Sequence, residues 1–297
     1  MRFSSAALLH LLWAGALLGC QPQADEQAAA TTADKFLAAD SADRPSVPAK
    51  PVAAAPVKVV TVAAGKEEDE TEGQGRFELP QVQLPDAAVA ARLNQAIVAA
   101  SFWMEADWLQ LSTRQAVQRC LREYQENDKQ GLTSLSYNVV CNEHGVLTLA
   151  LTSDYLGAYP YTDTRCFVFD TRTGRRLRVA DLVRDTTALR TRWRTAISQR
   201  VAAHLRADLV ETLGDSAVAA ELPALLHWNA AKQQVTFEAN EPRFDDFAVT
   251  RRGLTLAYSF GLPHVIQAAE PERDYSFTYA ELRPWLRTDG PLVPWLP

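Results

Sequence analysis

The sequence predicts an α+β fold in which an antiparallel sheet packs with a long N-terminal and a long central helix. Two observations lead to this expectation. Apolar residues recur at helical spacing over residues 87–121 and again over 188–209. Between and after these stretches, short segments alternate apolar and polar residues and are separated by polar turns. Helices and strands are therefore segregated along the chain, which is typical of α+β rather than βαβ architecture.

The segment between the two predicted helices has the pattern of an antiparallel meander. Each strand is joined to the next by a connection short enough for consecutive strands to pair. The expected strands are residues 133–140, 146–151, 166–170 and 176–179. Further elements follow the central helix, namely a helix at 217–226, strands at 234–239, 247–250 and 254–260, and a closing helix at 278–286. The two groups predict small subdomains, 76–184 and 185–297, packed as one unit.

The first 19 residues are typical of a cleavable lipoprotein signal peptide. Residues 6–18 are apolar apart from His10, and the order Leu-Leu-Gly-Cys ending at Cys20 resembles the bacterial lipobox. The apolar stretch is shorter than the roughly 20 residues of a membrane-spanning helix. We therefore expect a diacylglyceryl group and a fatty acid such as palmitate on Cys20, which would hold the chain on a membrane. The alternative is a plain secretory signal with a chance cysteine at its end.

Residues 20–75 are predicted to form the lipid anchor and a disordered tether. Their Ala, Pro, Thr and charged residues cannot bury enough apolar surface to offset the entropy of ordering. The prolines between residues 45 and 56 favour an extended spacer. Gln23-Ala24-Asp25-Glu26 resembles a surface-export signal of Bacteroidetes lipoproteins. The expected location is the cell envelope, at the outer membrane, on its periplasmic side or at the cell surface.

Charge and cysteine content narrow the classes of partner. The net charge of the 297 residues is −6 and no basic stripe is present, so a nucleic-acid partner is not expected. The cysteines after Cys20 are Cys120, Cys141 and Cys166. They allow one intramolecular disulfide, for which we expect Cys120–Cys141, unless all three are small buried apolar residues. No metal-ligand spacing occurs, and neither a metal nor another cofactor is expected.

The sequence contains no strong catalytic motif. A nucleophile elbow, a P-loop and a dinucleotide-binding glycine pattern are all missing. If the protein were a hydrolase of wall material, Glu241, Asp245 and Asp246 would be the first candidates, because paired carboxylates can catalyse glycoside hydrolysis. Carboxylates in loops are usually solvated, so the sequence favours a protein that is not an enzyme.

Tyr155, Tyr159 and Tyr161 form the most suggestive candidate ligand-binding cluster. They lie on a connection that contains glycine and proline, and exposed rings there could bind a sugar or a protein. The alternative is that the three rings cover the end of the sheet as part of the core.

Several stretches resemble a known domain of unknown function. Residues 155–160 (YLGAYP) match its Gly-Ala-(His/Tyr)-Pro turn, residues 169–182 match its Asp-x-x-Thr-Gly-(Lys/Arg)-x-Leu-x-Leu-x-Asp-Leu motif, and residues 277–286 match its closing Tyr-x-x-Leu-x-Pro-x-Leu helix. In this motif Asp170 would cap a turn and Gly174 would take a positive φ. The domain occurs in the lysozyme-sensing anti-sigma factor RsiV and the peptidoglycan deacetylase PdaC. Residues 261–264 depart from its pattern.

The resemblance spans about residues 77–286 and implies binding at the cell wall. Neither a deacetylase domain nor an anti-sigma tail is expected, so catalysis and signalling do not transfer. The sequence thus predicts a lipid-anchored, non-catalytic envelope domain that binds peptidoglycan, another sugar or a lysozyme-like protein. A wall-active hydrolase and a structural partner in envelope assembly are the alternatives.

Overall fold

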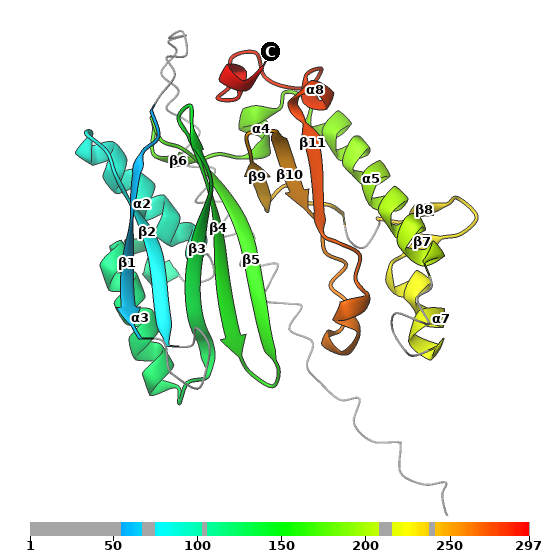
Figure 1. The fold of residues 1–297 in the computed structure, drawn as a ribbon, viewed down its shortest axis with the longest axis horizontal. Coiled ribbons are helices and arrows are strands. Elements are labelled where there is room, and N and C mark those ends of the chain that lie inside the picture. Colours follow the sequence, from blue (N-terminus) through cyan, green and yellow to red (C-terminus); the bar gives the residue numbers. More distant parts are fainter. Residues whose placement is uncertain (1–54, 67–74, 103–105, 208–215, 238–240, 297) are drawn as a thin grey trace, which may run out of the picture. The chain divides into compact units, whose positions relative to one another are not determined.

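The computed structural model describes residues 55–66, 75–102, 106–207, 216–237 and 241–296 (Figure 1). The chain divides into two units, residues 1–47 and 48–297, and all described residues belong to the second. Cys20 and most of the predicted tether lie outside the described residues. Within the described ranges, no helix is both long and apolar enough to cross a membrane.

A six-stranded sheet with the strand order β1-β2-β3-β4-β5-β6 forms the first half of the domain. Its strands are β1 (Lys58–Gly65), β2 (Arg76–Gln83), β3 (Gly131–Glu143), β4 (Val146–Leu156), β5 (Pro160–Asp170) and β6 (Arg175–Arg176). Neighbouring strands are antiparallel except β2 and β3, which are parallel. The predicted meander is therefore confirmed as β3–β6, with β3, β4 and β5 longer than expected.

The first strand lies inside the segment that the sequence analysis assigned to the tether. β1 pairs with β2 along its whole length, so the predicted tether boundary at residue 75 is wrong for residues 58–65. The physical reason is its run of β-favouring valines, of which Val62 is buried in one apolar cluster and Val57 and Val59 pack against another. The Asn142 side chain holds the start of this strand. It accepts a hydrogen bond from the Val57 amide at 2.9 Å and donates one to the Val57 carbonyl at 2.8 Å.

The predicted N-terminal helix is broken into α2 (Ala87–Ser101), a 3-10 helix (Ala106–Gln110) and α3 (Thr113–Glu126). The prediction of one continuous helix is wrong because Ser112 starts a new one. Its side chain accepts from the Gln115 amide, and the Gln115 side chain accepts from the Ser112 amide, which is a capping box. Both helices pack on one face of the sheet (Figure 1), where α2 contacts β2 and α3 contacts β1 and β2.

The predicted turn at Gly174 is confirmed. Gly174 has a φ of 74°, and a β-carbon there would lie 2.7 Å from the carbonyl oxygen of Val89. The Asp170 carboxylate accepts a hydrogen bond from the Arg172 amide at 2.9 Å. Glycine is therefore required both by the backbone conformation and by the close approach of α2.

The second half of the domain contains the central helix and two smaller sheets. A three-stranded antiparallel sheet has the order β11-β10-β9, and β7 pairs with β8. The elements are α4 (Val179–Leu182), α5 (Thr186–Arg206), α7 (Ser216–Leu225), β7 (Trp228–Asn229), β8 (Gln234–Val235), β9 (Phe247–Val249), β10 (Gly253–Ala257), β11 (Asp274–Thr278) and α8 (Tyr279–Leu282). The predicted elements agree closely with α5, α7, β9 and β10, whereas β7 and β11 were not predicted and the predicted closing helix extends beyond Leu282.

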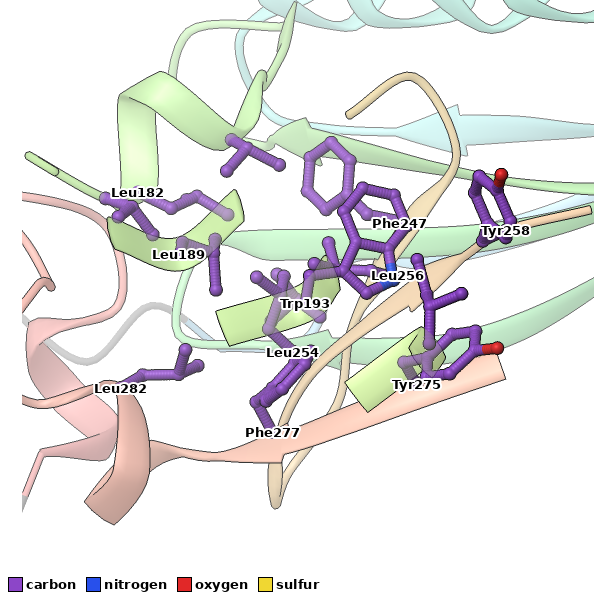
Figure 2. Packing of buried hydrophobic residues seen from close by; sticks show 14 of the residues in the cluster. Leu182, Leu189, Trp193, Phe247, Leu254, Leu256, Tyr258, Tyr275, Phe277 and Leu282 are labelled. Carbon is purple, nitrogen blue, oxygen red and sulfur yellow. The ribbon is translucent and has the colours of Figure 1, made fainter. Parts of the chain in front are cut away.

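One apolar cluster joins α5 to this sheet (Figure 2). Leu189 and Trp193 of α5 lie against Leu254 and Phe277 of the sheet, and all four are buried. The same cluster includes Val146 of β4 and Val168 of β5. In addition, the buried Thr148 hydroxyl donates to the Val249 carbonyl at 2.9 Å. The large sheet therefore has α2 and α3 on one face and shares a core with β9 and α5 on the other, so the fold is α+β as predicted.

Candidate functional site

The predicted tyrosine cluster lies at the tip of the β4–β5 hairpin (Figure 1). Tyr155 is in β4 and Tyr161 is in β5, and they are direct cross-strand partners. Their rings stack with centroids 4.7 Å apart and an interplanar angle of 9°. The loop of the hairpin is therefore shorter than the expected connection, because only Gly157, Ala158 and Tyr159 lie between the two strands.

Tyr159 contacts a residue that is distant in sequence. Its ring stacks on His264, with centroids 5.0 Å apart and planes 18° from parallel. His264 begins a 3-10 helix, His264–Ala269, in the segment between β10 and β11. We refer to Tyr155, Tyr159, Tyr161, His264 and Val265 as the aromatic tip.

The central helix holds the segment that carries His264. Arg200 of α5 donates to the carbonyls of Glu272 and Asp274, both at 2.6 Å. His204 of α5 lies 2.9 Å from the carbonyl oxygen of Ala269. The position of His264 therefore depends on α5, and sequence reasoning missed it because no local signal places it beside Tyr159.

The aromatic tip is the main exposed apolar surface of the described chain. Tyr159 is 60% exposed, Tyr161 51% and Val265 82%. These are three of the five large hydrophobic residues classed as exposed in the described ranges, and the other two are Val139 and Val140 of β3. Scattered exposed apolar residues are ordinary, whereas a group at one place marks an interaction surface.

The three tyrosines differ in what they do. Tyr155 is half-buried, in partial agreement with the alternative that the cluster covers the sheet end. Burial, and after it the neighbouring Tyr161, raises the pKa of its hydroxyl. Burial and the nearby Asp163 carboxylate raise the pKa of Tyr161 in the same direction. Both phenols are therefore neutral at physiological pH, so Tyr161 presents an uncharged ring and a hydroxyl that can donate a hydrogen bond.

The carboxylates proposed for the enzyme alternative have structural partners. The two oxygens of Asp246 accept from the Cys166 amide at 2.8 Å and from Arg273 at 2.7 Å. Burial raises the pKa of this carboxyl above its ordinary value of 3.8. Glu241 forms ion pairs with Arg190 at 3.4 Å and Arg194 at 3.9 Å on α5. Through these contacts Asp246 and Glu241 connect elements of the fold.

Asp245, the third candidate, takes part in the fold through its backbone. Its carbonyl accepts from Arg176, whose guanidinium lies 4.6 Å from the centre of the Phe167 ring. Within the described ranges, no group of three His, Cys, Asp or Glu residues is arranged to hold a metal ion.

The predicted Cys120–Cys141 disulfide is not present, and both residues are buried thiols. Cys120 packs in the same apolar cluster as Leu135 of β3. Cys141 lies six positions beyond Leu135 on the same strand, which is roughly 20 Å. A disulfide requires α-carbons roughly 4.4–6.8 Å apart, so the two thiols are too far apart to bond. Burial raises the pKa of Cys141, and it raises that of Cys166 to about 12.

The fold and the site define an α+β domain that presents an aromatic hairpin tip. No protein-family model matches the chain. A comparison with curated proteins also gives no match.

Similar solved structures are DUF3298 family proteins. One is a DUF3298 family protein from Pseudomonas aeruginosa PAO1, with 16% identity and a TM-score of 0.47, where the match covers 79% of this chain and 96% of the other. Another is a DUF3298 family member from Bacteroides fragilis NCTC 9343, with 15% identity and a TM-score of 0.44, where the match covers 78% and 94%. The resemblance to the RsiV and PdaC domain stays a prediction.

Proposed function

We propose that this chain is a non-catalytic binding domain of the cell envelope and that its ligand contacts the aromatic tip. The observation that carries the proposal is the pair of exposed rings, Tyr159 and Tyr161, each backed by a stacked partner. Tyr155 and His264 fix these rings in place, so little side-chain entropy is lost when a ligand stacks on their open faces.

The chemistry of the tip suits a wall glycan. Rigid, neutral aromatic faces are suited to the apolar faces of sugar rings, and a phenolic hydroxyl can bond to sugar hydroxyls. Peptidoglycan is the glycan that a protein of the envelope would meet. A wall-acting protein such as lysozyme is the competing ligand, because exposed tyrosines are also frequent hot spots in protein interfaces.

Replacing Tyr159 tests the glycan proposal. We expect the full-length chain to bind soluble peptidoglycan fragments, and Tyr159→Ala to weaken the affinity about tenfold, as for one aromatic hot spot. Tyr159→Phe is the matched control, because it keeps the ring and should change binding little. Titration calorimetry with muropeptides, and in parallel with lysozyme, provides the measurement. Binding of lysozyme alone would transfer the proposal to a protein ligand, and binding of neither would overturn it.

The proposed location depends on the lipid anchor at Cys20. The motivation is the lipobox-like sequence at the end of an apolar stretch too short to span a bilayer. In cells fed an alkyne analogue of palmitate, the wild-type chain should carry the label and fractionate with membranes. Cys20→Ser should lose both properties while the thiols at 120, 141 and 166 remain as an internal control. Label retained by that variant would contradict the anchor.

A further inference from the structure

The half of β5 nearest the aromatic tip is an edge of the large sheet. β6 pairs only with Phe169 and Asp170, at the other end of the strand. Next to that pairing, the Val168 carbonyl accepts from Leu177 at 2.7 Å, and the Cys166 amide donates to Asp246. From residue 165 back to Pro160, β4 is the only strand of the described chain that pairs with β5.

Backbone groups along this edge point away from β4. In an antiparallel ladder, alternate residues direct their N–H and C=O groups to opposite sides. Cys166 and Val168 direct theirs outward, so Thr162 and Thr164, which are in phase with them, do the same. Both threonines are exposed, and no backbone hydrogen bond from another part of the described chain reaches them on this side.

The edge is protected at its two ends and open between them. Pro160, which has no amide hydrogen, is the first residue of β5. At the other end, the Asp246 carboxylate accepts the hydrogen bond of the Cys166 amide. Proteins usually cover, charge or shorten exposed edges, because unpaired strand groups recruit other chains. Here two β-favouring threonines lie beside the rings of the aromatic tip. Such an edge has the hydrogen-bonding pattern of an extended peptide, which can bind by adding a strand.

Carboxylates lie on both faces of this edge. Asp163 is near enough to Tyr161 to raise the pKa of its hydroxyl, and Asp274 acts in the same way on the Cys166 thiol. Tyr161 and Cys166 project from opposite faces of β5, because their positions differ by an odd number. Exposed Glu272 adds a further negative charge on the segment that leads into β11. Arg165 lies 4.0 Å from Asp163 and Arg273 lies 2.7 Å from Asp246, whereas no ion pair is found for Glu272 or Asp274 in the described ranges. An added strand would therefore meet an excess of acidic groups, which favours a basic peptide.

We propose that the β5 edge from Pro160 to Cys166 receives an extended, basic segment of a partner protein as an added strand. The free backbone groups of Thr162 and Thr164 specify an extended chain, and the surrounding carboxylates specify lysine or arginine side chains. The site shares Tyr161 with the aromatic tip, but it depends on the backbone of β5 and not on the open ring faces, so it does not rest on the proposed glycan ligand.

The test uses a capped heptapeptide of alternating lysine and valine, the length of the edge. We expect it to bind the full-length chain and to slow amide hydrogen exchange at Thr162 and Thr164. Thr164→Pro removes one outward N–H, a change tolerated at a strand edge, and should weaken binding about tenfold. Thr164→Val keeps the N–H and is the matched control. Asp163→Lys should also weaken binding, and the corresponding glutamate–valine peptide should not bind.

Three results would overturn the proposal. The first is the absence of saturable binding by the lysine–valine peptide. The second is binding with unchanged exchange at Thr162 and Thr164. The third is concentration-dependent protection of these amides without peptide, together with dimers in sedimentation, which would assign the edge to a second copy of this chain. Loss of glycan binding by Tyr159→Ala bears only on the aromatic tip.

Discussion

At the scale of single residues, burial determines which cysteine thiols can ionise and react. The Cys166 thiol is the clearest example, because desolvation and the carboxylates of Asp246 and Asp274 raise its pKa to about 12. Cys141 is shifted in the same direction by burial and by Glu143. Thiolates are the nucleophilic form, so these cysteines should be unreactive at neutral pH while the domain is folded. Their role is that of small apolar residues in the packing.

The chemical state of the cysteines can be measured directly. In the folded full-length chain at neutral pH, we expect iodoacetamide to modify Cys120, Cys141 and Cys166 only slowly, because all three are at least partly buried as thiols. After unfolding in urea without reductant, all three should be alkylated within minutes, as seen by mass spectrometry. If Cys120 and Cys141 resisted alkylation in urea until a reductant was added, the result would support the predicted disulfide between them.

At the scale of elements, the ends of helices and strands depend on single polar side chains. Ser112 begins α3, and Thr278 begins α8 with a capping box that includes Glu281. The hydrogen bonds from the amide and hydroxyl of Thr278 lower the pKa of the Glu281 carboxyl. The folded protein therefore binds a proton at Glu281 less tightly than the unfolded chain does. The stability that Glu281 contributes is lost as the pH falls below the ordinary pKa of 4.5 for this group.

The hydrogen bonds of the Asn142 side chain to Val57 should stabilise the start of β1. Asn142→Ala removes both hydrogen bonds to Val57 and should lower the free energy of unfolding by about 2 kcal/mol, at about 1 kcal/mol per bond. Urea unfolding followed by circular dichroism measures the change. Asn138→Ala, at an exposed position of the same strand, is the control and should stay within about 0.5 kcal/mol of wild type. Equal effects of the two substitutions would contradict the role given to Asn142.

Some elements could be predicted because local pattern and final packing agree. Leu189, Trp193, Ile197 and Val201 follow one face of α5, and all are buried in the shared core. The meander was predictable in the same way, from alternation and short turns. The turn around Gly174 was predictable because a positive φ favours glycine whatever surrounds it.

Other features could not be read from local pattern. β1 was missed because its valines lie between alanine- and proline-rich stretches that indicate a tether. The break before α3 was missed because the capping box at Ser112 lies inside one long apolar periodicity. At the site, Tyr155, Tyr159 and Tyr161 were found from composition, whereas His264 reaches Tyr159 only through the placement of the β10–β11 segment by α5.

At the scale of the whole molecule, a few polar contacts connect the two sheets. Asp246 bonds both to the backbone of β5 and to Arg273 beside β11. Thr148 bonds from β4 to β9. Because one apolar cluster also contains residues of both sheets, removing either sheet would expose the core of the other.

Asp246 gives this junction a predictable pH dependence. Its raised pKa means that the folded protein binds the proton more tightly than the unfolded chain. The stability that this group contributes is therefore fully present below its ordinary pKa of 3.8 and is lost as the pH rises through its folded pKa. Urea unfolding of wild type and Asp246→Asn should show the wild type losing stability relative to the variant over that range. A relative gain with rising pH would contradict the assigned shift.

The two hydrogen bonds between Asn142 and Val57, here called the clamp, also determine how the domain would respond to a pulling force. The clamp lies at the end of β3 that is opposite the hairpin tip, since Asn142 pairs with Leu147 whereas the other end of β3 pairs with Tyr155. A pull applied through residue 57 and resisted by a ligand at the tip would run along the strands. Hydrogen bonds that lie across the strands would then be loaded together in shear and not broken one at a time. The strands are thus oriented so that the sheet resists stretching between residue 57 and the aromatic tip.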